Sequence, residues 1–138
     1  MPQLVAFVDG GSHGNPGPAG VGVVLTDDSG HRVEISESIG HGDNNYAEYS
    51  ALLFALKYAI SNEFADVSVF SDSEVVVKQM NGHYACQSPV LREIYELCRA
   101  LIDSLERFSI AHVRREHNAH ANRLAHAAIV RAKSESTA

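Results

Sequence analysis

The order of the apolar segments along the chain is the feature that most constrains its fold. Three short strand-like segments come first, separated by turns rich in Gly, Pro and Asp. They are the apolar runs Leu4–Val8 and Val21–Leu25, and the segment Val33–Ile39, in which apolar and polar residues alternate as in a half-exposed strand. From about residue 45 the apolar spacing becomes helical, and strands and helices then alternate. Short turns join antiparallel strands, whereas strands separated by helices pair in parallel, so the pattern predicts a mixed sheet.

The second part of the chain supplies the helices and two further strands. Tyr49, Leu52 and Leu56 recur at helical spacing, and Asn44 or Asn45 is placed to cap that helix. The elements predicted after the first three strands are a helix at 45–61, a strand at 67–71, helices at 73–80 and from Pro89 onward, a strand at 108–113 and a helix at 119–132. The predicted fold class is therefore α/β, with a five-stranded mixed sheet in the order βββαβααβα covered by helices.

One domain accounts for the predicted elements. The 138 residues contain no internal repeat, low-complexity tract or linker, so we expect a single domain at 1–133 and a flexible C-terminal tail at 134–138. No apolar run approaches the roughly 20 residues of a membrane helix, and no signal-peptide pattern is visible. We therefore expect a cytoplasmic protein without a membrane partner, in which Cys86 and Cys98 are free thiols.

Three acidic residues stand at positions that are hard to explain by packing. Asp9 and Asp72 each follow a buried apolar strand, and Glu48 lies in the first helical turn, four residues before the core position Leu52. Strand ends are where α/β sheets bind ligands, so one fold could bring the three together. Adjacent carboxylates repel one another unless a cation holds them, and hard oxygen ligands suit Mg²⁺ or Mn²⁺. A pair of such ions can clamp the two oxygens of a phosphate that is being cleaved.

Each acidic residue also has a simpler explanation when it is taken alone. Asp72 could be a helix N-cap, Glu48 could complement a helix dipole, and Asp9 could form a turn. The net charge of −6 argues mildly against nucleic-acid binding, which usually depends on Lys and Arg. Any basic surface must therefore be local, and Arg114 and Arg115 are the best candidates for it.

Four segments in order resemble ribonuclease H of type I: FVDGGSHGNPGPAG, NNYAEYSALLFAL, VFSDSEVVVKQMNG and VRREHNAHANRLAHAA. The resemblance implies a ribonuclease H-like fold and an endonuclease that hydrolyses the RNA strand of RNA–DNA hybrids. It also implies a two-metal-ion mechanism that uses two Mg²⁺ ions, with Mn²⁺ as a substitute, and leaves 5′-phosphate and 3′-hydroxyl ends. Residues 83–88 carry no Lys or Arg, which resembles the compact bacterial and archaeal branch without a basic protrusion.

The resemblance also implies roles for individual residues. Asp9, Glu48 and Asp72 match the metal-binding carboxylates of the family. The residues expected to contact the RNA–DNA hybrid are Gly10, Gly11, Ser12, Asn15, Asn44, Asn45, Arg114 and Arg115. The backbone of the first three lies where RNA 2′-hydroxyls are read, a group that DNA lacks. We expect a monomer that needs no protein partner.

The last helix departs from the family pattern at one position. Asn122 stands where the family carries a fourth carboxylate, and its carbonyl oxygen could still bind a metal ion. We therefore count Asn122 among the catalytic metal ligands and expect one ion to bind more weakly. Many family members use a loop histidine in proton or product handling, and His117 is the better of two candidates in that stretch, ahead of His120.

Two alternatives to hybrid cleavage remain open. The loss of the fourth carboxylate at Asn122 could leave a catalytically weak or inactive hybrid-binding module. The same fold also serves nucleases and integrases that act on DNA. Retention of Asp9, Glu48 and Asp72 argues against a pure binder, because carboxylates without a cation would repel phosphate.

Overall fold

The computed structural model describes residues 2–137, with side chains described as far as Glu135. Its strands are β1 (Gln3–Ser12), β2 (Gly17–Asp27), β3 (Arg32–Gly42), β4 (Asp66–Ser71) and β5 (Arg107–His112). Its α-helices are α1 (Asn44–Ser61), α2 (Glu74–Met80), α3 (Pro89–Asp103) and α4 (Ala119–Thr137), and a 3₁₀ helix, η1 (Arg115–Asn118), precedes α4. The predicted order of strands and α-helices is confirmed.

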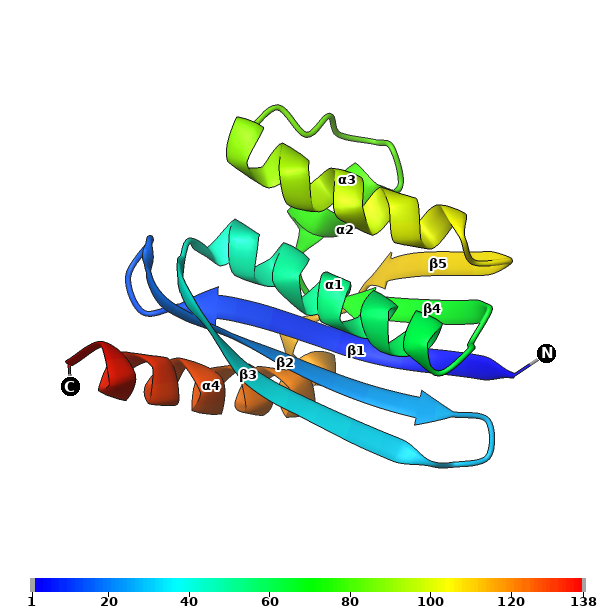
Figure 1. The fold of residues 1–138 in the computed structure, drawn as a ribbon, viewed down its shortest axis with the longest axis horizontal. Coiled ribbons are helices and arrows are strands. Elements are labelled where there is room, and N and C mark those ends of the chain that lie inside the picture. Colours follow the sequence, from blue (N-terminus) through cyan, green and yellow to red (C-terminus); the bar gives the residue numbers. More distant parts are fainter. Residues whose placement is uncertain (1, 138) are drawn as a thin grey trace.

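The five strands form one mixed sheet in the spatial order β3-β2-β1-β4-β5. The first three strands pair antiparallel, whereas β4 pairs parallel to both β1 and β5. Both features agree with the prediction from turn and crossover lengths. Helix α1 covers one face of the sheet, with α3 packed beyond it, and α4 lies on the other face (Figure 1).

Two glycines allow the helices to approach the sheet closely on its two faces. A Cβ atom at Gly10 of β1 would lie 2.1 Å from the Ala47 carbonyl oxygen of α1. A Cβ atom at Gly22 of β2 would lie 2.1 Å from the Ala121 carbonyl oxygen of α4. Gly22 is the cross-strand partner of Asp9, the neighbour of Gly10, so the two glycines face opposite sides of the sheet. Side chains of Asp9 and of α4 therefore share one face.

The first strand is longer than predicted. The expected turn at Asp9 does not occur, because β1 continues to Ser12 and pairs with β2 as far as Ala19. Glycine is usually read as a turn signal, but here it marks a close approach of strand and helix. Asp9 therefore lies inside a strand, and its side-chain direction is fixed by the sheet.

Two of the expected helix boundaries also differ. Asp43, and not Asn44 or Asn45, caps α1, and its carboxylate accepts a 2.7 Å hydrogen bond from the Tyr46 backbone N–H. Helix α4 continues to Thr137, beyond the expected end at Ala132, because no Gly or Pro interrupts this stretch. The residues expected as a tail are thus helical as far as 137.

Both cysteines are buried and unpaired, as expected: Cys86 and Cys98. Within residues 2–137, no helix combines the length and the apolar character needed to cross a bilayer.

Candidate metal centre

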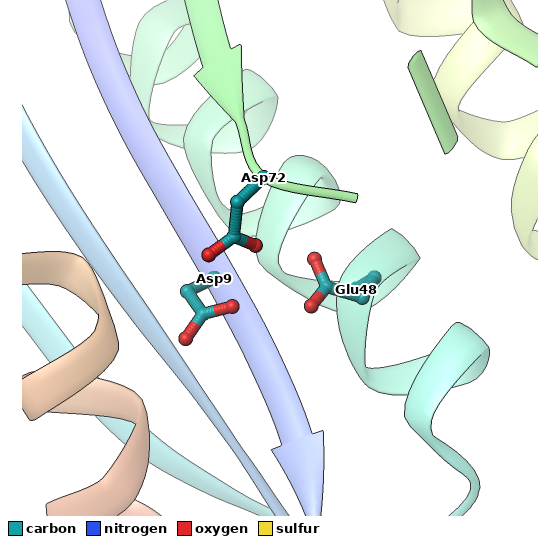
Figure 2. Close-up of side chains that lie close together, drawn as sticks. All are labelled: Asp9, Glu48 and Asp72. Carbon is teal, nitrogen blue, oxygen red and sulfur yellow. The ribbon is translucent and has the colours of Figure 1, made fainter. Parts of the chain in front are cut away.

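The candidate site lies where β4 ends and β1 continues. The last parallel pair between these strands joins Val8 to Ser71, so the edge of β1 is no longer covered by β4 beyond that point. Asp9 is the next residue of β1 and Asp72 the first residue after β4, while Glu48 enters from α1 (Figure 2). One carboxylate oxygen from each of the three lies within 4.8 Å of the others. The predicted convergence of these three residues is therefore present.

Asp72 does not cap the helix that follows it. Ser73 is the N-cap of α2, and its hydroxyl accepts a hydrogen bond from the Val76 backbone N–H at 3.4 Å. The simpler explanation of Asp72 as a helix cap thus fails, and its carboxylate is directed toward Asp9 and Glu48 instead (Figure 2).

Burial makes the carboxylate cluster costly to ionise without a cation. Only 6% of Asp9 is exposed, and this burial, together with the charge of Asp72, raises the pKa of Asp9 to about 6. The pKa of Glu48 is raised well above its ordinary value, first by burial and then by the charge of Asp9. Both shifts have the sign expected for clustered carboxylates that lack a counter-ion.

The residues of the cluster fit a hard divalent cation. Glu48 Oε2 and Asp72 Oδ2 are buried, and neither has a hydrogen-bond partner among the described residues. Buried carboxylate oxygens are rarely left unpaired, because burial removes their water. Carboxylate oxygens are the ligands that Mg²⁺ and Mn²⁺ prefer, and a cation would satisfy these atoms and offset the repulsion.

Asn122 joins the cluster through its nitrogen. Its Nδ2 donates a 2.8 Å hydrogen bond to Asp9 Oδ2, and this contact favours the ionised form of Asp9. The sequence suggested a metal ligand that acts through the carbonyl oxygen. Its role as a ligand stays a prediction, whereas its contact with Asp9 is part of the structure.

The segment before α4 is tied to β1 beside the carboxylates. Asn118 is buried, and its Nδ2 donates a 2.9 Å hydrogen bond to the Val8 carbonyl oxygen, one residue before Asp9. This contact fixes the start of α4, and hence Asn122, relative to the cluster. No sequence pattern singles out Asn118.

Asp9, Glu48 and Asp72 line one pocket, called here the carboxylate pocket, and the expected histidine is not among its lining residues. His117 is exposed in η1 and lines a separate pocket with Phe7 and His120. His120 is itself held by Arg32 through Nδ1 and by Glu34, whose Oε2 lies 2.7 Å from His120 Nε2. A role for His117 in proton handling stays a prediction, but the structure does not bring it to the three acids.

A different histidine does line the carboxylate pocket. His126 of α4 lies in its wall, together with Asp9, Glu48 and Asp72. Helical spacing in the sequence predicts this position, because His126 follows Asn122 by four residues and so lies on the same helix face.

The glycine-rich segment and the start of α1 are joined by side-chain hydrogen bonds. Asn44 Oδ1 accepts from the Ser12 backbone N–H at 3.0 Å and lies 3.1 Å from the Ser12 hydroxyl. The backbone N–H of Asn44 donates to Asn15 Oδ1 at 2.9 Å. Three of the residues expected to contact the hybrid thus form one connected group, whereas Asn45 is exposed beside it.

The remaining expected hybrid contacts divide between the pocket and the surface around it. Gly10, Gly11 and Arg115 line the carboxylate pocket, and the positive charge of Arg115 acts to lower the pKa of Asp9. Arg114 is not in the lining of this pocket; its side chain is 80% exposed and lies 3.9 Å from Glu116.

Comparison with known proteins places this geometry in a family. Residues 7–128 match the family described as reverse transcriptase-like. A ribonuclease HI of Halobacterium salinarum is 41% identical over 92% of this chain. The crystal structure of RNase H1 from that archaeon superposes with a TM-score of 0.88 at 40% identity, covering 94% of this chain and 98% of the other. LC11-RNase H1, solved in complex with an RNA/DNA hybrid, gives a TM-score of 0.85 at 38% identity, with the same coverage of both chains.

The curated relatives are longer than this chain. The match spans 64% of the length of the Halobacterium protein and 35% of the length of a Mycobacterium tuberculosis relative that is 38% identical.

Proposed function

This chain belongs to the ribonuclease H family of type I, and from that membership and its metal centre we propose that it hydrolyses the RNA strand of RNA–DNA hybrids. The observation that carries the proposal is the convergence of Asp9, Glu48 and Asp72, with two buried oxygens that have no hydrogen-bond partner among the described residues and that a bound cation would satisfy. The hybrid bound by LC11-RNase H1 supports the choice of substrate.

In this proposal Asp9, Glu48 and Asp72 hold two Mg²⁺ ions, for which Mn²⁺ can substitute. When bound, such ions activate a water molecule and stabilise the departing 3′-oxygen, so the products carry 5′-phosphate and 3′-hydroxyl ends. The protein contributes fixed positions: β1 and β4 orient two carboxylates, and α1 presents the third across Gly10. Catalysis by positioned charge needs no covalent intermediate with the enzyme.

Recognition of the RNA strand is proposed for the group formed by Gly10, Gly11 and Ser12. Asn44 fixes the Ser12 backbone through its 3.0 Å hydrogen bond, so the segment is held in place before the substrate arrives. Contact with 2′-hydroxyls at this segment would select RNA over DNA. Asn15 and Asn45, with Arg114 and Arg115, are proposed to hold the strands.

We further propose that the chain acts as a monomeric cytoplasmic enzyme with a single ribonuclease H-like domain, which includes the part of α4 beyond the expected boundary at residue 133. The described helices include no candidate membrane span, and Cys86 and Cys98 are free thiols, which suits a reducing compartment.

The test is cleavage of an end-labelled RNA–DNA hybrid during titrations of Mg²⁺ and Mn²⁺, with Asp9→Asn in parallel. Metal-dependent cuts confined to the RNA strand, and lost in the variant, are expected. Single-stranded RNA and duplex DNA of the same sequence serve as controls, and preferential cutting of duplex DNA would show that the substrate is wrong.

A hybrid-binding module without catalysis is the second candidate, because Asn122 turns a donor toward Asp9 where the family has a carboxylate. Tight hybrid binding without cutting at any concentration of either metal would favour it. Restored cutting in Asn122→Asp would then identify Asn122 as the cause.

A further inference from the structure

We propose that His126 is a catalytic residue that donates a hydrogen bond to a phosphate oxygen of the RNA strand, at or beside the bond that is cut. The inference rests on the proposed cleavage of hybrids and assigns a substrate contact to a residue outside the set expected from the sequence. It is carried by the position of His126 in the pocket wall, by its free hydrogen-bonding capacity and by the small number of side-chain donors that line this pocket.

Helix α4 presents one continuous face to the carboxylate pocket. The α4 residues that line it are Asn122, Ala125, His126 and Ile129, at relative positions i, i+3, i+4 and i+7. Residues at these spacings lie on the same side of a helix. His126 therefore points to the same pocket as Asn122, one helical turn farther along.

The two neighbours of His126 on this face fix its place beside β1. On one side, Asn122 reaches Asp9 through its 2.8 Å hydrogen bond. On the other, the Cδ1 atom of Ile129 lies 3.2 Å from the position that a Cβ atom on Gly11 would take. His126 lies between these contacts, and hence between the carboxylates and the Gly11–Ser12 segment proposed to read the RNA strand.

A phosphate in this pocket needs hydrogen-bond donors, and few side chains can supply them. The three carboxylates are acceptors when ionised. Asn122 already donates to Asp9, and Ser12 is bonded to Asn44. Among the described residues that line the pocket, Arg115 and His126 are the side chains that have N–H groups and no hydrogen bond. Asn44 could also donate through its amide nitrogen, but its Oδ1 is held by Ser12 at the start of α1, so only His126 offers such a donor from α4 between Asn122 and Ile129.

The chemistry of imidazole suits this task. Imidazole carries at least one N–H whether it is neutral or protonated, so the contact does not depend on its charge. His126 is exposed, which allows it to meet a ligand without rearrangement of the core. Arg115 comes from η1 and His126 from α4, so the two donors approach the pocket from different elements.

The first measurement is steady-state cleavage of the hybrid by His126→Ala, with His126→Gln as the conservative variant. A lost hydrogen bond to a charged phosphate is expected to lower kcat/KM by about tenfold. His126→Gln keeps an N–H donor and should recover part of the loss. His31→Ala is the matched control, because His31 is exposed in the turn between β2 and β3 and lines none of this pocket.

The second measurement separates a phosphate contact from a metal ligand or a structural effect. In an Asp9→Asn background, the Kd for the hybrid should rise by about tenfold when His126→Ala is added. Calorimetric titration of Mn²⁺ into otherwise wild-type protein without hybrid should be unchanged by His126→Ala. A weakened Mn²⁺ affinity would make His126 a metal ligand and overturn the proposal.

Failure of this inference is distinguishable from failure of the proposed function. If wild-type protein cuts hybrids and His126→Ala matches it in both kcat/KM and hybrid affinity, the inference is wrong while the function stands. If wild-type protein cuts no hybrid under any metal condition, the proposed function is wrong, and with it the catalytic assignment of His126.

Discussion

Asn122 Nδ2 lies 2.8 Å from Asp9 Oδ2 and donates a hydrogen bond to it, so the residue at the family's fourth carboxylate position contacts the buried acid of the cluster directly. A carboxylate at 122 could not donate when ionised and would add a fourth negative charge. The amide thus favours ionised Asp9 at no cost in charge, while it offers a metal ion a weaker ligand. Asparagine at position 122 therefore suits the metal-free cluster, whereas aspartate would suit the metal-loaded cluster.

Asn122→Asp should reverse that balance. Without metal, the variant is expected to be less stable by about 1–2 kcal/mol, because it loses a hydrogen bond and gains repulsion. With Mg²⁺ the loss should disappear, since an ion that binds only the folded state stabilises it. The check is thermal unfolding with and without Mg²⁺, together with the Mg²⁺ concentration that gives half-maximal cleavage, which should fall.

Asn122→Ala is the control for this prediction, because it removes the hydrogen bond without adding charge. Without metal, Asn122→Ala should be less stable than the wild type, and the Mg²⁺ concentration that gives half-maximal cleavage should not fall. If Asn122→Asp leaves both the metal dependence and the rate unchanged, position 122 is not a ligand in this chain.

The metal-free protein should lose stability as the pH rises through the range in which Asp9 ionises. The pKa of Asp9 is raised from 3.8 to about 6, so between these values the folded state binds more protons than the unfolded state. The free energy of unfolding must then fall with rising pH across this window. The Asp9 contribution amounts to at most about 3 kcal/mol, and the raised pKa of Glu48 acts in the same direction.

This pH dependence is measured most cleanly as a difference between two proteins. Denaturant unfolding of wild type and Asp9→Asn in a chelator, from pH 4 to pH 8, should show the variant gaining in relative stability as the pH rises. Excess Mg²⁺ should remove most of the difference at pH 7. A difference independent of pH would mean that Asp9 titrates near its ordinary value.

The sequence predicted the fold and the three carboxylates because both follow from local patterns. Apolar spacing and turn residues specified the element order, and Asp72 directly follows an apolar run that is indeed a strand. The boundaries around Asp9 could not be read in this way, because Gly10 and Gly11 signal a turn locally. Only the pairing with β2 and the contact with α1 turn the same glycines into strand residues.

The less predictable parts of the site depend on contacts between distant segments. The bond from Asn118 to the Val8 carbonyl oxygen joins residues 110 positions apart, and no local pattern signals it. Tertiary packing likewise decides whether Asn122 presents its amide nitrogen or its amide oxygen to Asp9. The helical spacing of His126 and Asn122 does predict that they share a face, whereas the resemblance to the family favours a histidine in the preceding loop, and hence His117.

Gly10→Ala should damage both stability and activity, because the new Cβ atom would lie 2.1 Å from the Ala47 carbonyl oxygen. Helix α1 would have to move away from β1 and carry Glu48 with it. A loss of about 2–4 kcal/mol in the free energy of unfolding is expected, as for overpacking against backbone. Denaturant unfolding measures the loss, and Mn²⁺ titration reports the displacement of Glu48.

Gly11→Ala is the matched control for that stability measurement. Its Cβ atom would meet the Cδ1 atom of Ile129 at 3.2 Å, which is the end of a side chain that can shift. Its stability should fall by less than half as much as that of Gly10→Ala. Equal losses for the two variants would show that the close approach at Gly10 is not what limits the packing of α1.

The two neighbouring arginines should differ in their effect on hybrid cleavage. Arg115 lines the carboxylate pocket, whereas the side chain of Arg114 is 80% exposed and lies 3.9 Å from Glu116. Arg115→Ala should therefore raise KM for the hybrid by about tenfold, and Arg114→Ala by no more than about twofold. Loss of a phosphate contact also releases one counterion fewer, so the slope of log affinity against log salt should decrease by about 1 for Arg115→Ala alone.

A second effect of Arg115→Ala follows from its charge. The guanidinium acts to lower the pKa of Asp9, so its removal should raise that pKa further and shift the acidic limb of the cleavage pH profile to higher pH. Arg115→Lys keeps the charge and should preserve the pH profile, but it loses the planar pair of N–H donors with which a guanidinium binds a phosphate. Equal KM values for Arg114→Ala and Arg115→Ala, with parallel salt slopes, would place the phosphate contact outside the carboxylate pocket and make this basic pair a general surface charge.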